Sequence, residues 1–516
     1  QTTGNGRLIL GPISRFDGDV NFNFPQLFLN GATYNGTATM QKNGATDNTS
    51  VGGNIFNGVT SITNSSSANF LRLANSNADN YNADVTFSQN HAGVLAPNYN
   101  TNCTYGGNVT ISAPSTYTIT FGSAAGGIAT FNGTTAQTIN KSGSVTNPVF
   151  TRLVMNKTAN DVTLNTRINI VTSLTLTQGI INTTATNILN MNNAATTTIG
   201  NATSYINGPM NYDMALSGTR TLNFPIGKVA DWRPAVLTAV HNAATSYTYK
   251  AELTNADAQA LGYTKPVTVD VISQIHYWDI DRSVTATGVA SPTANVSGNQ
   301  TITLYYGTND VVTDPSFLTI VKNRNTAPTT WFDIGGTGAT LGAGSVTSTS
   351  APSAFNSYSR FSLGNKIGGT NPLPIELIYF TAKPNEKEVS LDWATASEIN
   401  NSHFDIERSV DGVNFEYLAT INANGDGNHV TKQTYNTIDK KPYKGLSYYR
   451  LKQVDKSGEF KYATIVSVEF KDNSFVNVFP NPAFDKITIN TSDDFINANL
   501  KVINNLGVEV ISNNLL

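Results

Sequence analysis

Short stretches of alternating apolar and polar residues fill the first 150 residues of the chain. Examples are Val59–Thr63, Val85–Phe87 and Val109–Ile111, which are rich in β-branched residues. A period of two is typical of β-strands with one buried face. We therefore expect Val, Ile and Phe to point inward, and Thr and Ser to point outward.

An aromatic residue and a turn pair recur at a regular spacing beside these strands. The aromatic residues are Tyr34, Phe56, Tyr81, Tyr105 and Phe131, which are 22–26 residues apart. One coil of this length cannot bury its own apolar face, but stacked coils bury a continuous core. The spacing predicts a β-solenoid over residues 1–209, of roughly eight coils and about 40 Å in length. Inward aromatic residues, and Asn at matching corners, are expected to stack as ladders.

Longer strands separated by turn residues follow this region. Candidates include Ala235–Val240, Ser246–Lys250 and Thr301–Tyr306. This pattern favours a β-sandwich over residues 210–370. The Gly- and Pro-rich stretch Gly364–Pro374 reads as a linker. The predicted fold class is therefore all-β, with an N-terminal β-solenoid followed by β-sandwich domains.

Three resemblances to known families extend this interpretation. The stretch Phe150–Pro209 resembles the repeat regions of adhesin-like surface proteins of Bacteroidota. Residues 375–470 resemble a fibronectin type III module, in which Val389–Trp393 would supply a core Trp on an early strand. In the same module Tyr448–Asp455 would supply a late strand with paired Tyr.

The C-terminal residues 475–516 are similar to type A sorting domains of the type IX secretion system. The residues that carry this resemblance are Phe479, Pro480, Asn481, Pro482, Gly507 and Glu509. The resemblance implies a secreted protein on the cell surface, with the type IX secretion machinery as a partner. Such domains usually continue through two or three further strands, so the domain is expected to be incomplete at Leu516.

Charge excludes some functions and separates two parts of the chain. The net charge is −3 and only 13% of residues are charged, which gives no basic surface for nucleic acid. Of the first 230 residues 17 are charged, against 33 of the last 145. No run of 18 apolar residues occurs, so no transmembrane helix is expected. Cys103 is the single cysteine, which excludes an internal disulfide, and no His lies beside it, so we expect it to be inert.

Catalytic chemistry has few candidate residues. A polysaccharide-degrading β-helix would need paired titratable groups beside one bond. The first 230 residues contain seven acids, of which only Asp79 and Asp84 sit in one turn. The five histidines are scattered and lack the spacing of a zinc site. His276, beside Trp278, is expected on a strand face. We therefore predict that the chain is not an enzyme and has no catalytic or metal-binding residues.

Two ligands are considered beside this prediction. No cofactor is expected, although the acidic turns Asp17–Asp19 and Asn424–Asn428 carry the oxygen ligands that calcium favours. A surface glycan could stack on the periodic aromatic residues if they were exposed, whereas core stacking explains the same period.

The leading hypothesis is a structural protein or adhesin stalk. A second hypothesis is a self-assembling extracellular filament, in which the apolar segment Arg7–Ile13 of one subunit would complete the C-terminal domain of the next by strand addition. A third hypothesis is a glycan-binding or polysaccharide-degrading protein.

Overall fold

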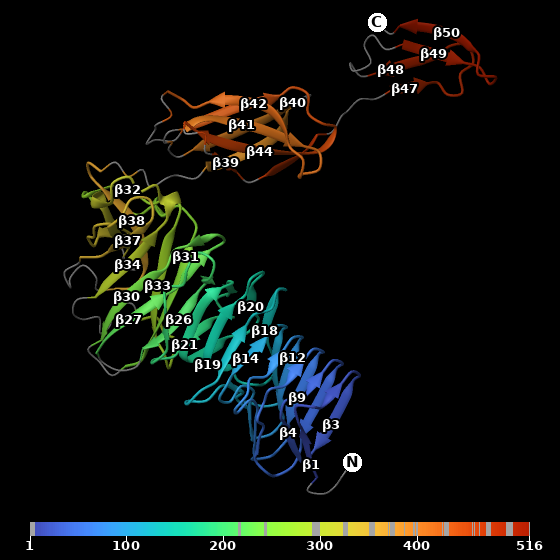
Figure 1. The fold of residues 1–516 in the computed structure, drawn as a ribbon. Coiled ribbons are helices and arrows are strands. Elements are labelled where there is room, and N and C mark those ends of the chain that lie inside the picture. The colour runs from blue at the N-terminus through green and yellow to red at the C-terminus, as the bar shows by residue number, and fades with distance from the viewer. Residues whose placement is uncertain are drawn as a thin grey trace. The chain divides into compact units, whose positions relative to one another are not determined.

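A computed structural model describes residues 6–214, 218–241, 245–291, 300–323, 329–349, 357–369, 371, 377–385, 388–395, 398, 401–425, 427, 433–456, 458, 460–463, 465–470, 476–491 and 499–514. These residues form two units, Gln1–Pro374 and Ile375–Leu516 (Figure 1). The described residues contain strands and three short 3-10 helices, Gln259–Leu261, Thr308–Asp310 and Pro315–Phe317, but no α-helix. The all-β prediction is confirmed.

The first unit begins with a β-solenoid of about nine turns, slightly more than the eight expected. One side is an 11-stranded sheet, here called the long sheet, in which all strands but the last run parallel (Figure 1). Its strands, in spatial order, are β3 (Val20–Phe24), β6 (Ala38–Lys42), β9 (Thr60–Asn64), β12 (Val85–Gln89), β15 (Val109–Ala113), β18 (Gln137–Gly143), β20 (Val162–Leu164), β22 (Ile181–Asn182), β25 (Ile206–Asn207), β28 (Ile226–Lys228) and β29 (Asp231–Trp232).

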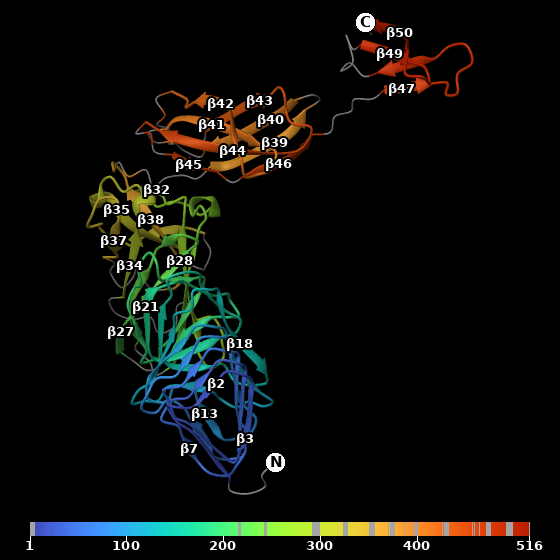
Figure 2. The same ribbon diagram turned by 45° about the vertical axis from the view of Figure 1, so that its right-hand side comes forward.

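A second side, here called the aromatic side, consists of shorter parallel strands. They are β2 (Arg15–Phe16), β5 (Thr33–Tyr34), β8 (Ile55–Phe56), β11 (Asn80–Tyr81), β14 (Asn102–Tyr105), β17 (Ile128–Phe131) and β24 (Thr196–Thr197). The first of them, β2, is labelled in Figure 2. The third side contains β1 (Arg7–Leu10), β4 (Gln26–Leu29), β7 (Asn48–Thr49), β10 (Phe70–Arg72), β13 (Val94–Ala96), β16 (Thr120–Phe121), β23 (Leu189–Met191) and β26 (Met210–Met214). The long strands β19 (Val149–Asn156) and β21 (Ile168–Gln178) run across both of these sides.

The alternation of buried and partly exposed residues fixes the register of the strands in the long sheet. In Val85–Gln89 and Val109–Ala113 the first, third and fifth residues are buried and the others are partly exposed. A slip by one residue would expose Phe87 and Ile111, so the apolar residues hold each strand in place. The expected arrangement, with Ile, Val and Phe inward and Thr and Ser outward, is confirmed in these two strands. In Val59–Thr63 Ile62 points inward as expected, but Thr60 is buried and Val59 is exposed, because Ile62 fixes the alternation of that strand.

The predicted aromatic ladder forms the core of the aromatic side. The rings of Tyr34, Phe56 and Tyr81 stack at centroid distances of 4.8 Å and interplanar angles of 5° and 4°. The stack continues through Tyr105 at 5.3 Å and Phe131 at 5.5 Å. These distances are close to the spacing of neighbouring strands, so the backbone ladder itself sets the ring stacking.

The turn that follows each ring begins with Asn or Gly and continues with a small residue, Gly or Ala. Asn57 donates a side-chain hydrogen bond to Asn35 and accepts one from Asn82, at 2.8 and 2.7 Å. A Cβ atom on Gly58 would lie 2.1 Å from the carbonyl oxygen of Gly36, so the turns can stack only when the second residue is small. The expected Asn ladder is therefore present. The close approach of Gly58 to Gly36 explains why glycine recurs after Asn in these turns.

The sheets of the solenoid continue past residue 209. Strand β26 pairs in parallel with β23 and antiparallel with β31 (Tyr247–Thr254), which pairs with β33 (Tyr277–Val284). The remaining strands of this sheet are β38 (Arg360–Lys366), β35 (Leu318–Asn323), β36 (Trp331–Asp333) and β32 (Val269–Ile272). A second sheet contains β27 (Gly218–Phe224), β30 (Ala235–His241), β34 (Thr301–Tyr306) and β37 (Gly344–Thr347). One hydrophobic core runs from Leu10 to Leu363, without a break at the predicted boundary.

The second unit contains a two-sheet sandwich. One sheet has the order β39 (Leu377–Asn385), β40 (Glu388–Thr395), β43 (Gln433–Asp439). The other contains β42 (Glu416–Asn422), β41 (Asn401–Ser409), β44 (Gly445–Asp455) and β45 (Phe460–Tyr462), with β46 (Val466–Phe470) also paired to β44. Trp393 is fully buried and stacks on Tyr435 at 5.5 Å, so the predicted core Trp is confirmed. The proposed boundary at residue 470 stays a prediction.

Two hairpins complete the described residues. Strand β47 (Val476–Phe479) pairs with β48 (Thr488–Thr491), and β49 (Asn499–Ile503) pairs with β50 (Glu509–Asn514). Their large apolar side chains are exposed, among them Val478, Phe484 and Leu506.

Candidate functional site

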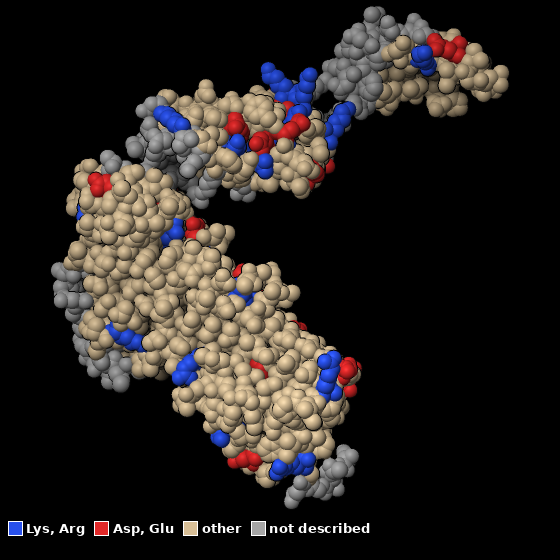
Figure 3. All heavy atoms as spheres, viewed as in Figure 1, with Lys and Arg blue, Asp and Glu red and all other residues tan. Residues whose placement is uncertain are grey.

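The outer face of the long sheet is the most regular surface of the first unit. Twelve side chains on six successive strands form two columns, here called the hydroxyl face. They are Asn21, Asn23, Thr39, Gln41, Ser61, Thr63, Thr86, Ser88, Thr110, Ser112, Asn140 and Ser142. None of them is charged, and each lies in register with its counterpart on the next strand. Figure 3 shows how few charged side chains the visible face of the first unit carries.

Several hydroxyls of this face are available to a ligand. Within the described part of the chain, the side chains of Ser61, Thr86 and Ser88 make no hydrogen bond. The Asn residues of the neighbouring turn instead bond to one another, as Asn57 does with Asn35. The hydroxyl face therefore offers donors and acceptors that repeat about every 4.8 Å along the solenoid.

The periodic aromatic residues are not a glycan platform. Tyr34, Phe56, Tyr81, Tyr105 and Phe131 are each at most 1% exposed. Stacking of a sugar on these rings, which the sequence left open, is excluded because the rings pack on one another inside the core. Core stacking is the correct reading of their period.

All seven acids of the solenoid bind a neighbouring coil. Each carboxylate accepts a hydrogen bond from a residue 18–35 positions away, at 2.6–3.4 Å. The donors are Asn35 for Asp17, Thr37 for Asp19, Phe70 for Asp47, Asn54 for Asp79, Asn108 for Asp84, Ile180 for Asp161, and Asn190 and Thr248 for Asp213. These acids therefore join coils to one another, and Asp79 and Asp84 do not share an acidic turn.

Asp79 is instead buried among the inward residues of the aromatic side. Its Oδ1 accepts hydrogen bonds from the backbone and side-chain nitrogens of Asn54, at 2.8 and 2.7 Å. Burial raises the pKa of Asp79 from 3.8 to about 7, and the bonds from Asn54 only partly oppose this rise. Cys103 lies one coil further on, fully buried, and its thiol pKa is raised by the same burial. This environment agrees with the expectation that Cys103 is inert.

The pKa of Asp79 predicts a pH dependence of stability. Between pH 4 and 7 the folded chain retains a proton that the unfolded chain has lost, so the free energy of unfolding falls as pH rises through this range. The slope is at most about 1.4 kcal/mol per pH unit. Asp79→Asn should remove this part of the slope, whereas Asp84→Asn, at an exposed position, should leave it. Urea unfolding of the three proteins at several pH values measures the difference; equal slopes for wild type and Asp79→Asn would contradict the prediction.

The two candidate calcium turns differ in what the structure shows. Asp17 Oδ1 accepts hydrogen bonds from Arg15 and Asn35, and Asp19 Oδ1 accepts one from the backbone of Thr37. These oxygens are therefore already used by protein donors. In the turn Asn424–Asn428, residues 426 and 428 lie outside the described residues. Within the described ranges, no three His, Cys, Asp or Glu side chains are grouped to hold a metal ion.

The sorting residues lie on the two C-terminal hairpins. Phe479 ends β47, and the peptide bonds before Pro480 and Pro482 are cis. Gly507 has a φ of +78° in the turn between β49 and β50. Glu509 forms an ion pair with Lys501 at 2.9 Å. The assignment of these residues to a sorting motif stays a prediction. Strand addition by Arg7–Ile13 also stays a prediction; within this segment, Arg7–Leu10 forms strand β1.

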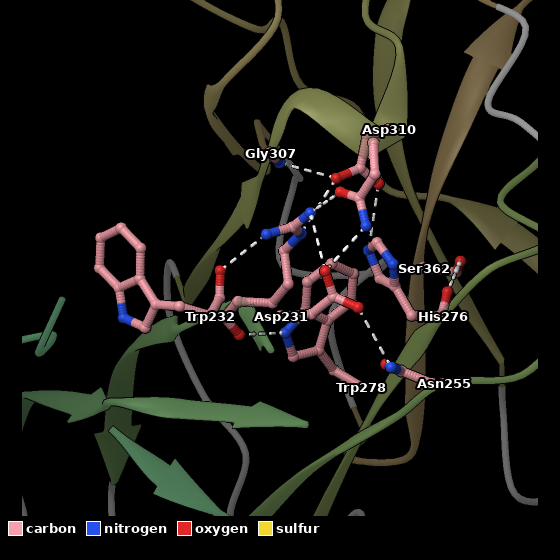
Figure 4. Close-up of polar contacts among 10 residues, drawn as sticks. Asp231, Trp232, Asn255, His276, Trp278, Gly307, Asp310 and Ser362 are labelled. Atoms are coloured by element: carbon pink, nitrogen blue, oxygen red, sulfur yellow. Dashed lines mark hydrogen bonds and ion pairs between the residues drawn. The ribbon is translucent and has the colours of Figure 1, made fainter. Parts of the chain in front are cut away.

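No pattern in the sequence predicted the buried ionic cluster that Figure 4 shows. Arg233 Nε donates to Asp310 Oδ2 at 3.0 Å, and His276 Nε2 lies 3.3 Å from Asp310 Oδ1. The Asp310 side chain is fully buried, and Trp278 Nε1 donates to the carbonyl of Arg233 at 2.9 Å. Arg233, His276 and Asp310 are 34–77 positions apart in the chain, so no spacing pattern marks them. His276 is therefore buried within this cluster instead of lying on an open strand face.

The cluster has the geometry of a structural site. Burial lowers the pKa of His276, Asp310 opposes this effect and Arg233 adds to it. Ser362 Oγ donates to the backbone oxygen of His276 and makes no bond to its ring (Figure 4). The Gly307 amide donates to Asp310 Oδ2 at 2.7 Å. Arg233 and the Gly307 amide therefore both bond to Asp310 Oδ2, whereas His276 Nε2 and Asp310 Oδ1 make no hydrogen bond among the described residues.

Comparisons with known proteins assign no family to the chain. No family model matches the chain. No curated protein matches it either. Among solved structures, a β-1,2-glucanase from Parabacteroides distasonis is 11% identical, with a TM-score of 0.14. The match covers 52% of this chain and 38% of the glucanase, and so weak a similarity carries no functional argument. In the part of the chain that the structure describes, no helix is long and apolar enough to cross a membrane.

Proposed function

We propose that the chain is an extracellular structural protein whose solenoid forms the rigid stalk of a surface adhesin. The observation that carries this proposal is that the solenoid's acids, its turn Asn residues and its stacked rings are committed to contacts between coils. The acids, the Asn ladder and the stacked rings all join one turn to the next. A solenoid of about nine turns held in this way spans roughly 43 Å as one continuous core.

Export by the type IX secretion system forms the second part of the proposal. The resemblance of residues 475–516 to a sorting domain supports it. The sandwich with buried Trp393 supports a fibronectin type III-like connector between stalk and sorting segment. The chain would thus be secreted, retained at the cell surface, and independent of a catalytic centre.

Deleting residues 475–516 is expected to abolish surface display. The full chain and the deletion variant would be expressed in a Bacteroidota strain that has the secretion system, and whole-cell labelling would measure display. A matched control replaces Asp485 and Lys486, exposed residues between the two strands of the first hairpin, by Ala. This control should be displayed normally. Normal display of the deletion variant would contradict the export proposal and leave the stalk proposal untouched.

Binding of a neutral glycan is a second candidate function, favoured by the hydroxyl face. Its partner-free, uncharged hydroxyls suit an uncharged and repeating polyhydroxyl chain. Thr86→Arg combined with Thr110→Arg would place two bulky charges on the face and should abolish retention on an insoluble neutral polysaccharide. Thr130→Arg, which lies outward on the aromatic side, should not. Equal retention of both variants would contradict this function.

A further inference from the structure

The interior of the aromatic side contains polar atoms that the protein does not satisfy. The hydroxyls of Tyr34, Tyr81 and Tyr105 and the Oδ2 atom of Asp79 are buried and have no hydrogen-bond partner among the described residues. Tyr81 and Tyr105 are fully buried, as is Asp79. Buried polar groups of this kind are nearly always bonded to protein or to ordered water. Four unpaired atoms in one part of the core therefore point to a bound molecule.

Three of the four atoms belong to two adjacent coils, whereas Tyr34 lies on the other side of Phe56. Tyr81 and Tyr105 are paired in register on adjacent strands, and Asp79 lies two residues before Tyr81, on the same inward face. The backbone nitrogen of Asp79 also contacts the sulfur of Cys103, two residues before Tyr105, at 3.4 Å. Burial raises the pKa of all three tyrosine hydroxyls, and the nearby charge of Asp79 adds to the rise.

Ring stacking sets the distance between the two adjacent hydroxyls. The rings of Tyr81 and Tyr105 have centroids 5.3 Å apart and planes within 5° of parallel. Their hydroxyl oxygens therefore lie about 5 Å apart, which is too far for a direct hydrogen bond of about 2.7 Å. The same distance is spanned by two such bonds that meet at one water molecule.

We propose that the solenoid core binds an ordered water molecule between the hydroxyls of Tyr81 and Tyr105, with Asp79 Oδ2 as its third partner. Three partners is the usual number for a buried water. The order of Phe and Tyr along the ladder would then determine which coils of the core hold water. Phe56 and Phe131 bound the pair Tyr81 and Tyr105 on either side, so the water is confined to these two coils, and Phe56 separates it from the Tyr34 hydroxyl.

Water fits this site better than a metal ion. Calcium takes six to eight oxygen ligands, and magnesium demands an octahedral set. Here two phenol oxygens and one free carboxylate oxygen are available, because the other carboxylate oxygen of Asp79 is held by Asn54.

The first test is crystallographic and uses the full chain. Crystals that diffract well enough to resolve ordered solvent should show density about 2.7–2.8 Å from both hydroxyls. Tyr105→Phe should remove this density and leave the rings stacked, since Phe already occupies two positions of the ladder. Density absent from the wild-type crystal, or an anomalous signal at that position after a rubidium soak, would overturn the proposal.

The second test uses the sign of a stability change. If water bonds the Tyr105 hydroxyl, Tyr105→Phe removes a satisfied hydrogen bond and should lower the urea midpoint of the first unit. If the hydroxyl is dry and unpaired, the same change removes a buried unsatisfied group and should leave or raise the midpoint. Tyr117→Phe, at a partly exposed ring against the same core, is the control and should not shift it. A raised or unchanged midpoint for Tyr105→Phe would refute the water site.

Discussion

Replacing Phe56 by alanine is expected to destabilise the solenoid by about 3–5 kcal/mol. Phe56 is fully buried, and its ring is held between Tyr34 and Tyr81 at 4.8 Å on each side. The size of the effect depends on whether the neighbours can close the gap. The coils are fixed by backbone bonds, such as Asn57 N to the Tyr34 carbonyl and Asn82 N to the Phe56 carbonyl, both 2.8 Å. The cavity therefore cannot collapse, which favours the upper part of the range.

The matched control for Phe56→Ala is Val59→Ala, three residues later in the same coil. Val59 is 56% exposed, so its truncation should change stability by no more than about 0.5 kcal/mol. Hydrogen exchange would locate the loss, which should centre on the coils next to Phe56 because each turn contacts mainly its neighbours. Similar unfolding free energies for the two variants would show that the ladder is not the main source of stability.

Asp310→Ala is expected to cost a comparable amount, about 3–5 kcal/mol, for an electrostatic reason. The change leaves the buried Arg233 guanidinium without its carboxylate at 3.0 Å and removes the acceptor of the Gly307 amide. Neither group can reach water, since the Arg233 side chain is only 8% exposed. Asp231 Oδ1 would remain 3.8 Å from Arg233 Nη2, but its side chain is 33% exposed, so the buried guanidinium would keep only a distant and partly solvated partner. This poorly compensated charge, more than the lost contact, accounts for the expected cost.

The control for Asp310→Ala is Asp281→Ala. Asp281 pairs with Lys250 at 3.1 Å, but the two side chains are 49% and 39% exposed. Solvent screens such a pair, so the expected loss is below about 1 kcal/mol. Fluorescence of Trp278, whose indole bonds to the Arg233 carbonyl, would follow unfolding near the cluster. If Asp310→Ala behaves like Asp281→Ala, the cluster does not support the fold.

The solenoid could be predicted because its signal is local and repeated. Alternation around Phe87 and Ile111 and the spacing of Tyr81 and Tyr105 each depend on residues within one coil or between adjacent coils. The same alternation could also have identified Asp79 as inward, since it lies two residues before the buried Tyr81. Treating it as part of a turn with Asp84 overlooked that signal.

The continuation of the core past residue 209 had no such signal. It depends on β26 pairing with β23 on one edge and β31 on the other, and any strand with a free edge can accept either partner. The hydroxyl face was predicted only in part. The alternation in the sequence placed Thr and Ser outward, but it could not show that six strands align these residues in columns.

By itself, the sequence determined that the chain is all-β, that its first part is a stacked solenoid, and that the periodic aromatic residues belong to its core. A period of two along a strand and a period of one coil between strands are properties of the covalent chain, and burial follows them directly. Only the tertiary structure decided which charges meet. Arg233, His276 and Asp310 come together because three distant segments pack on one core, and no local pattern of residues encodes such a contact.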